Sequence, residues 1–480
     1  MSNDVSEQRA EYADLLPYQQ ANRAAVKGKR AIRKGGIKYL TPLASMLCNT
    51  TYDHDTGTGT TTYSKTLTAK GLAEFNKYLD NAYFYGASGR TVMGLSGLIL
   101  AKPASVKLPS KIDYLTDNVD GKGKSLSDFA SEIVSDTFAS VWSGVLVARP
   151  ETPEGSSEKD VEDNNLRPKL LHYKFESIIN WDYTVINNEE VLSLLVLVES
   201  TTKRDGFKVE TEKQYRVLEL IEGVYNQSLY NKDKELINPV SPVIINGSTS
   251  SEIPFYWIQA GEGDKAVIDD LVDANFQHYN IYADYGSKLH YSSFIVYYET
   301  GVNGQSSNMV VGNGVKWNGG QDSSFGVLQP NGNADSHRLA LQDTELRMAA
   351  LGAEMLKPRS SGVESAEAKG LDQVAQNSTT ANVANTVSQV ITRACNFASK
   401  WMGGTEDTVY SLNTDYNPTG MNPQLLSTLI AAVQSENTIS GQTLYELMQK
   451  GEVASNKRTY EQEQALIVAE NNDNGIQNDE

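Results

Sequence analysis

The stretch SLSDFASEIVSDTFASVW, residues 125–142, is the clearest helix in the sequence. Ser125 followed three residues later by Asp128 is typical of a capped helix start. The apolar residues that come next recur at i, i+3 and i+4, so they share one face of a helix. The sequence therefore predicts an amphipathic helix over 125–142 whose stripe is Leu126, Phe129, Ala130, Ile133, Val134, Phe138, Val141 and Trp142.

Helical patterns also dominate the chain before this helix. Residues 1–47 are polar and helical, with a basic patch at 27–30 and at Arg33-Lys34. A second helical pattern runs over 67–100. Between them, residues 49–65 are rich in Thr and Gly and have no helical period, which predicts a loop.

After the capped helix the pattern changes to alternation. Residues 150–165 are acidic and poor in apolar residues, which predicts a loop. Residues 170–258 are rich in β-branched runs, including VLSLLVLV at 191–198, and predict a β-rich module. Its turns are expected at Asn187-Asn188, at Asp205-Gly206 and at 231–233.

Helical patterns return in the C-terminal half. One helix is expected from Lys265, and Ser336 is a candidate cap for another that Pro358 ends. A Ser/Ala/Asn-rich helix is expected over 364–401. Pro423 opens a helical hairpin whose second helix starts near Ser440. The polar residues from Glu470 onward predict a disordered tail.

Composition excludes several classes of protein. The chain has 480 residues and a formal charge of −18, which argues against a protein that coats DNA or an anionic membrane. No segment approaches the roughly 18 apolar residues of a membrane span, so no membrane partner is expected. The polar N-terminus excludes a signal peptide. With only Cys48 and Cys395, a cysteine zinc site and a disulfide scaffold are excluded, and a reducing compartment such as cytoplasm fits best.

The sequence shows little that predicts catalysis. The segment GKGKS at 121–125 resembles the end of a phosphate-binding loop, but Asn118 stands where that motif needs glycine. None of the five histidines lies in an HExxH motif or has a ligand partner at metal-binding spacing; they are His54, His172, His278, His290 and His337. We therefore expect no catalytic residues, no metal and no cofactor, which favours a structural protein over an enzyme.

Several stretches taken together resemble the portal proteins, or head–tail connectors, of tailed bacteriophages. The resemblance is to a branch catalogued as a domain of unknown function, and it covers about residues 70–405 in matching order. The sequence ISGQTLYELMQKGEV near the C-terminus is similar to the end of many portal proteins, whereas 301–323 matches loosely. The segments that carry the resemblance to portal proteins are 90–103, 126–150, 167–181, 214–220, 253–258, 269–291, 325–356 and 364–372.

This resemblance implies an α+β fold, a portal-type elongated subunit with wing, stem helices, β-rich clip and helical crown. It also implies a homo-dodecamer at the capsid vertex of a virion, assembled in the host bacterial cytoplasm. Double-stranded DNA passes through such a ring during packaging and ejection. The implied partners are the major capsid protein, the terminase large subunit and head–tail adaptor proteins.

The family's parts map onto the sequence in chain order. In that architecture one stem helix descends to the clip and a second returns. The implied parts are 1–66 as an N-terminal arm and loop, 67–123 as part of the wing, 124–144 as the first stem helix, 145–262 as β-rich clip and wing, 263–288 as the second stem helix, 289–410 as wing and channel-lining helices, 411–468 as a crown helical hairpin and 469–480 as a disordered tail.

Two sets of functional residues follow from this mapping. Lys316, Arg338 and Arg347 are the candidates for contact with DNA in the channel. The residues expected to pack the stem helices are Phe129, Ile133, Val134, Phe138, Phe276, Tyr279 and Tyr282. Two alternatives stay open, namely another ring-forming head–tail adaptor, which is usually much smaller, and a nucleotide-binding enzyme supported only by the segment at 121–125.

Overall fold

The computed structural model divides the chain into two units, Met1–Thr414 and Asp415–Glu480. The described residues combine α-helices with β-strands, which confirms the predicted α+β class. The structure describes residues 4–53, 58–63, 66–148, 166–245, 248–292, 296–300, 324–328, 334–352, 366–405, 407–414, 416, 427–428, 430, 440–450, 454 and 458–476.

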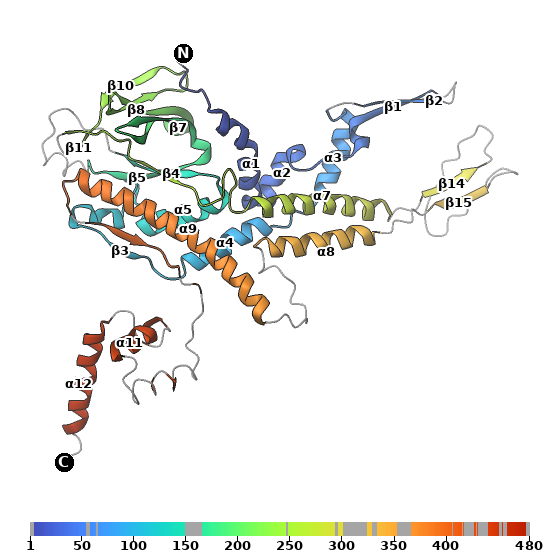
Figure 1. Ribbon diagram of the computed structural model, residues 1–480. Helices are drawn as coiled ribbons and strands as arrows, with labels where there is room; N and C mark the ends of the chain where they lie inside the picture. Colours follow the sequence, from blue (N-terminus) through green and yellow to red (C-terminus); the bar gives the residue numbers. More distant parts are fainter. Residues whose placement is uncertain are drawn as a thin grey trace. The chain divides into compact units, whose positions relative to one another are not determined.

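The N-terminal residues form helices, as the sequence predicts. They are α1 (Ala10–Lys27), α2 (Lys29–Gly35), η1 (Gly36–Lys38) and η2 (Ala44–Leu47), followed by α3 (Ala69–Asn81) and α4 (Ala87–Ile99) (Figure 1). Gly28 separates α1 from α2 with a φ of 78°, a left-handed value that favours glycine.

The loop predicted over 49–65 is wrong. In its place β1 (Cys48–Asp53) and β2 (Thr58–Tyr63) form an antiparallel pair. Threonine is β-branched and fits a pleated surface well, so a Thr-rich stretch without helical period forms strands here.

Helix α5 (Leu126–Ala139) is the capped helix of the sequence. The Ser125 hydroxyl accepts a hydrogen bond from the Asp128 backbone N–H at 3.1 Å. The helix ends at Ala139, three residues before Trp142, because Val141 and Trp142 lead into the next strand while remaining buried. Its neighbours include α1, α4, α9 and β5, so α5 is covered from several directions.

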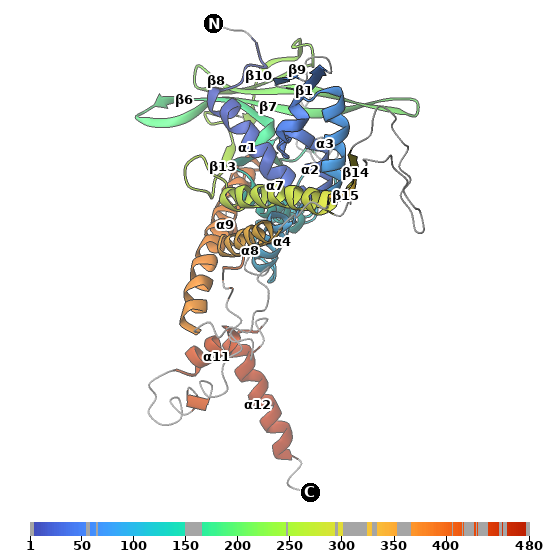
Figure 2. The same cartoon turned by 90° about the vertical axis from the view of Figure 1, so that its right-hand side faces the viewer.

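Two antiparallel sheets follow α5. The three-stranded sheet has the order β13-β4-β5, and the five-stranded sheet has the order β10-β9-β8-β7-β6. Figure 2 shows the long strands β7 and β8 side by side. The strands are β4 (Ser143–Ala148), β5 (Lys169–Lys174), β6 (Ile178–Ile186), β7 (Glu189–Asp205), β8 (Lys208–Ile221), β9 (Val224–Tyr230), β10 (Leu236–Pro242) and β13 (Phe255–Ile258), with the short pair β11 (Ile244–Ile245) and β12 (Ser248–Thr249) between β10 and β13.

The predicted turns join strands of the larger sheet. Asn187 and Asn188, both with positive φ, connect β6 to β7, and Gly206 lies between β7 and β8. One hydrophobic core lies between the two sheets and α1, where the Trp142 ring lies 4.5 Å from Phe175 and 5.2 Å from Trp181. The apolar run at 191–198 supplies Leu195, Val196 and Leu197 to it.

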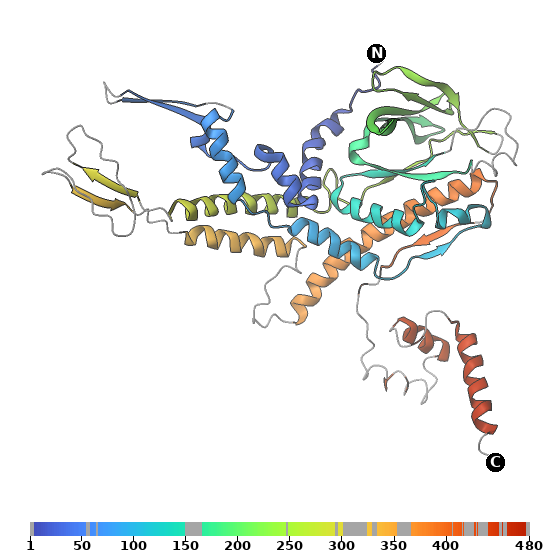
Figure 3. The same cartoon turned by 180° about the vertical axis from the view of Figure 1, so that it is seen from behind.

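Three helices complete the first unit. Helix α7 (Asp269–Ser292) and α8 (Asp335–Ala350) pack side by side, and β14 (Val296–Thr300) pairs with β15 (Ser324–Leu328) in the chain between them (Figure 3). Helix α9 (Ala366–Trp401) packs on α5, β13 and β4. The unit also contains η3 (Ser110–Thr116), η4 (Phe175–Ser177) and the antiparallel pair of β3 (Ser105–Lys107) with β16 (Val409–Ser411).

The predicted limits of α8 need correction. Ser336 is not its cap, since the helix begins at Asp335 and Ala334 makes no side-chain cap. The helix ends at Ala350, and Gly352 follows with a φ of 116°. Pro358, the expected stop, lies outside the described residues.

The second unit contains α11 (Gly441–Lys450) and α12 (Tyr460–Ile476). Ser440 caps α11, because its hydroxyl accepts from the Thr443 backbone N–H at 3.1 Å. The Tyr445 and Tyr460 rings lie 5.8 Å apart and join the two helices. Helix α12 continues beyond Glu470, where the sequence predicts a disordered tail.

Candidate functional site

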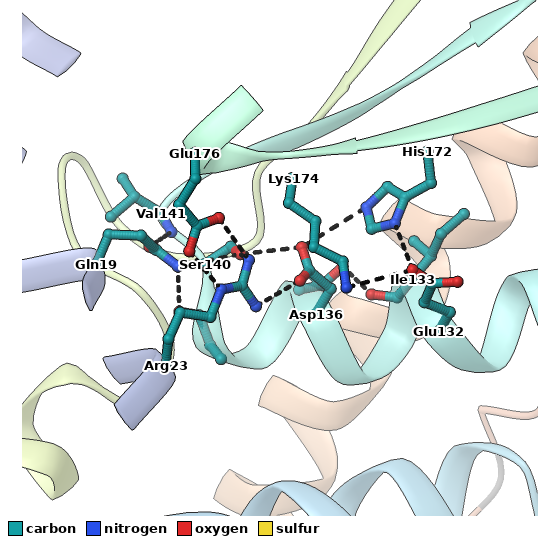
Figure 4. A network of polar contacts seen from close by, with 12 residues as sticks. Gln19, Arg23, Glu132, Ile133, Asp136, Ser140, Val141, His172, Lys174 and Glu176 are labelled. Atoms are coloured by element: carbon teal, nitrogen blue, oxygen red, sulfur yellow. Dashed lines mark hydrogen bonds and ion pairs between the residues drawn. The ribbon is translucent and has the colours of Figure 1, made fainter. Parts of the chain in front are cut away.

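A buried ionic network joins α1, α5 and η4. Arg23 on α1 pairs with Asp136 on α5, whose side chain is 3% exposed. The same guanidinium donates to Glu176 at 2.9 Å and to the Ser140 hydroxyl at 2.8 Å, and Ser140 donates to Asp136 at 3.0 Å (Figure 4). Burial lowers the pKa of Arg23, but Asp136 and Glu176 outweigh burial and raise this pKa above its ordinary value.

The network continues along α5 to Glu132. His172 on β5 lies between two carboxylates, with Nδ1 3.7 Å from Glu132 and Nε2 3.6 Å from Asp136, just beyond hydrogen-bonding distance. Lys124 and Lys174 reach Glu132 at 2.7 and 3.3 Å. The His172 ring and these two ammonium groups lower the pKa of Glu132 against the opposing effect of burial.

Gln19 fixes the end of α5 within the same network. Its amide donates to the Ala139 carbonyl at 3.1 Å and accepts from the Val141 N–H at 3.2 Å. These backbone groups lie where the helix ends, so they have no partner within α5. Gln19 thus allows α5 to end and the chain to enter β4 without leaving buried polar groups unpaired.

The ionic network holds these elements together. Its three cationic side chains each contact at least one of its three carboxylates, so the network joins α1 to α5 and η4, and α5 to β5. Sequence alone does not predict the network, because Arg23 is more than a hundred residues from its partners in the chain. No local pattern marks such a pairing.

The candidate residues of the first predicted stem helix are buried. Phe129, Ile133, Val134 and Phe138 are each at most 1% exposed. They belong to the core between α5 and its neighbours in the same chain.

The aromatic residues of α7 are covered by the same chain as well. Phe276 stacks on Tyr39 at 5.2 Å, and Tyr279 packs edge-on against Phe84 at 5.6 Å. Tyr282 lies 5.6 Å from Tyr83. The candidate packing residues therefore meet Tyr39, which follows η1, and the chain between α3 and α4.

The other side of α7 contacts α8 through polar side chains. Arg347 donates to the Gln277 side chain at 3.1 Å, and His278 lies 3.4 Å from Glu345. Burial lowers the pKa of His278, and Glu345 partly opposes it. Arg338 and Arg347 are both exposed on α8, whereas Lys316 lies outside the described residues.

The segment at 121–125 does not form an empty phosphate cradle. The Asp120 carboxylate accepts from the backbone N–H groups of Lys122 and Lys124 at 2.8 and 3.3 Å. Asn118 accepts from the Gly123 N–H at 2.8 Å. The amides that a nucleotide phosphate would need are thus bound to the chain's own side chains.

Among the described residues, no helix has the length and apolar content to cross a membrane. The same residues contain no group of three His, Cys, Asp or Glu side chains placed to hold a metal ion.

Comparisons with known proteins give three kinds of result. A family described as "Domain of unknown function (DUF4055)" matches residues 268–402, which span α7, α8 and α9. No curated protein matches the sequence. The chain is similar to the neck of a native GTA particle computed with C12 symmetry, at 10% identity and a TM-score of 0.40 over 78% of this chain and 92% of that one. It is similarly related to the neck of an empty GTA particle computed with C6 symmetry, at 10% identity and a TM-score of 0.41 over 77% and 91%. The virion of a native gene transfer agent (GTA) particle matches at 10% identity and a TM-score of 0.40, over 78% and 92%.

Proposed function

We propose that this chain is a portal-type ring subunit of a tailed-phage-like particle, through which double-stranded DNA passes. The observation that carries the proposal is the unit formed by α7, the β14–β15 pair and α8. The chain leaves along one helix, turns through a β-hairpin and returns along a second helix packed on the first. A portal stem and clip have this order of parts, and the ordered sequence resemblance also supports a portal-type subunit.

The stem pair proposed here differs from the pair expected from the sequence. Helix α5 packs on α9, α4, α1 and β5, whereas the most extensive contact of α7 is with α8, beside smaller contacts with α3, α1 and α4. The β-rich residues after α5 begin with β4 and end with β13, which pairs with β4. That segment therefore closes on itself instead of leading from one stem helix to the other. We propose α7 and α8 as the stem, the β14–β15 pair as part of the clip, and the β-rich module as part of the wing.

The chemistry of α8 suits a wall beside moving DNA. Arg338 and Arg347 are exposed, but each already has a partner, Asp335 at 3.6 Å and Gln277 at 3.1 Å. A cation that is partly engaged binds phosphate less tightly, because the existing contact must be given up. Weak contact is what a conduit needs, since tight phosphate pairing slows sliding. No enzymatic activity and no cofactor are part of this proposal.

Electron microscopy and native mass spectrometry of the purified full-length protein test the ring. We expect closed rings of one subunit number, with twelve as the expected value, because heterologous contacts close into rings when the rotation permits. A protein that stays monomeric at every concentration contradicts the proposal. Rings that exclude duplex DNA from their centre contradict the conduit role but leave a head–tail adaptor role.

Labelling of α8 tests its place in the ring. In a Cys48→Ser background, Arg338→Cys should react with a small maleimide in both monomers and rings. Reaction with a maleimide on a large polymer should fall at least about tenfold in rings if α8 lines the channel. Lys203→Cys on the β7–β8 hairpin is the matched control, because it lies far from α8 in the chain and is also exposed. Equal polymer labelling at both positions in rings contradicts this placement.

A further inference from the structure

A cationic groove lies where α1 meets α2. Residues 27–38 carry six cations and no carboxylate, in a chain whose formal charge is −18. The groove has a volume of about 370 Å³, and its charged and polar lining includes Arg23, Lys27, Lys34, Gln20, Tyr39 and Glu176. The six cations, all exposed, are Lys27, Lys29, Arg30, Arg33, Lys34 and Lys38.

Some of these charges are already used within the chain. Arg23 is held by Asp136 and Glu176, and Arg33 pairs with Asp80. Within the described residues, by contrast, no ion pair involves Lys27, Lys29, Arg30 or Lys34. Lys27 and Lys34 line the groove, and Lys29 and Arg30 lie between them in the sequence. The groove and the adjacent residues therefore present four cations with no acidic partner in that part of the chain.

A surface of opposite charge precedes and opens α7. Residues 262–273 hold five carboxylates and one lysine, Lys265, which pairs with Asp270 at 3.2 Å. Asp269 accepts from the Asn22 side chain. The remaining carboxylates of Glu262, Asp264 and Asp273 are exposed, and in the described part of the molecule none of them makes an ion pair. We name these three residues the acidic turn.

The groove and the acidic turn lie on different sides of α1. Asn22 faces Asp269, whereas Gln20, Arg23 and Lys27 line the groove. Asn22 and Lys27 are five residues apart, which separates them by roughly 140° around a helix of 3.6 residues per turn. Two complementary surfaces that face different directions cannot satisfy each other within one chain, but they fit a head-to-tail contact between copies.

We propose that the cationic groove of one copy receives the acidic turn of a second copy, an inference that rests on the proposed ring. Charge complementarity of this kind sets the register and speeds association more than it adds affinity. The four free cations and three free carboxylates give each subunit one donor surface and one acceptor surface. A ring uses every such surface once.

Duplex DNA is a poorer fit to the groove than a short acidic turn. A duplex carries one charge about every 1.7 Å along its axis, so it extends far past four cations. Charges beyond a Debye length of about 8 Å are screened, so only a short partner benefits from the local field.

A charge-swap experiment on the full chain tests the contact. Lys27→Glu with Lys34→Glu should raise the protein concentration needed for half-assembly at least about tenfold, and Glu262→Lys with Asp264→Lys should do the same. The four changes together keep the net charge of −18 and should restore assembly to within about threefold of the native chain. The matched control joins Glu262→Lys and Asp264→Lys to Lys107→Glu and Lys203→Glu, which also keeps −18 and should not restore it.

Each outcome separates the contact from the ring itself. Circular dichroism and melting temperature of every variant must match the native protein, since the altered residues are exposed. If both variants assemble into rings as readily as the native protein, the proposed contact is overturned and the proposed ring stands. If the single pairs of changes abolish assembly and the combined variant does not restore it, the proposed contact is also overturned. In that case, tighter binding of duplex DNA to the native protein than to the Lys27→Glu, Lys34→Glu variant would favour DNA as the occupant of the groove. Absence of rings from the native chain overturns the proposed function.

Discussion

Arg23 contacts carboxylates from two different elements, so its removal leaves more than one charge without a partner. Arg23→Met leaves Asp136, which is 3% exposed, and Glu176 without their shared guanidinium partner. We expect a loss of about 3–5 kcal/mol in the free energy of unfolding, because an uncompensated buried charge is costly. Urea unfolding followed by circular dichroism measures it.

The matched control removes both charges of the pair. Arg23→Met with Asp136→Leu should recover most of the loss, since a buried ion pair replaced by apolar side chains is often neutral for stability. A double variant as unstable as Arg23→Met alone would show that the pair itself, and not the stranded carboxylate, carries the stability.

Glu132 should make stability depend on pH in acid. Its pKa is lowered in the folded state by His172, Lys124 and Lys174, so between the folded and unfolded pKa values the unfolded chain binds more protons. The stabilisation is present above an unfolded pKa of about 4.3 and is lost as pH falls below it. Urea midpoints of native protein and Glu132→Gln should therefore differ by a constant amount near pH 7, and the difference should shrink progressively as pH falls below the unfolded pKa. A difference that stays constant in acid would contradict this origin.

The two cysteines should differ in reactivity. Cys395 is fully buried on α9, and burial raises its pKa to about 12, so its thiolate is scarce at neutral pH. Cys48 is partly exposed. A thiol reagent should modify one cysteine per native chain and two after unfolding, and mass spectrometry of peptides should place the first on Cys48. Native labelling of Cys395 at a similar rate would contradict its burial.

At the scale of elements, α5 is a helix whose buried stripe should not tolerate an added charge. Phe129→Asp places an unpaired carboxylate at a position that is 1% exposed, at a cost of several kcal/mol against a whole stability of about 5–15 kcal/mol. We expect loss of soluble, folded protein. Met93→Asp on α4 is the control, because Met93 is 70% exposed and should tolerate the change. A normal melting curve for Phe129→Asp would contradict the packing of α5.

Elements with local signals could be predicted, and contacts between distant segments could not. The stripe from Phe129 to Phe138 and the turn at Asn187-Asn188 lie within a few residues, so sequence alone locates α5 and the β6–β7 hairpin. Sequence alone does not predict the β1–β2 pair, because its residues are rich in Thr and Gly and have no helical period, a composition that loops share. The ion pair of Arg23 with Asp136 joins residues about a hundred positions apart, and so does the pairing of β13 with β4. The periodicity of a sequence does not predict contacts over such a separation.

At the scale of the whole molecule, the charge of −18 governs contact with DNA. The purified protein should bind duplex DNA weakly and without sequence preference, because its overall field repels phosphates. Each neutralised phosphate adds about −0.9 to the slope of log affinity against log salt, so few contacts give a shallow slope. Titrations of two unrelated duplexes at several salt concentrations measure both properties. Nanomolar discrimination between the duplexes at physiological salt would contradict a conduit and favour a regulatory protein.

The pairing of β13 with β4 also bears on how the chain is made. Strand β4 is buried along its whole length, with β5 on one edge and β13 on the other. At about 5–20 residues per second, the roughly hundred residues between β4 and β13 take about 5–20 s to leave the ribosome. Throughout that time one edge of an apolar strand lacks its neighbour and offers a template for pairing with another nascent chain. A ribosome that pauses between residues 175 and 254 prolongs this exposure, so the yield of folded protein depends on how quickly that stretch is translated.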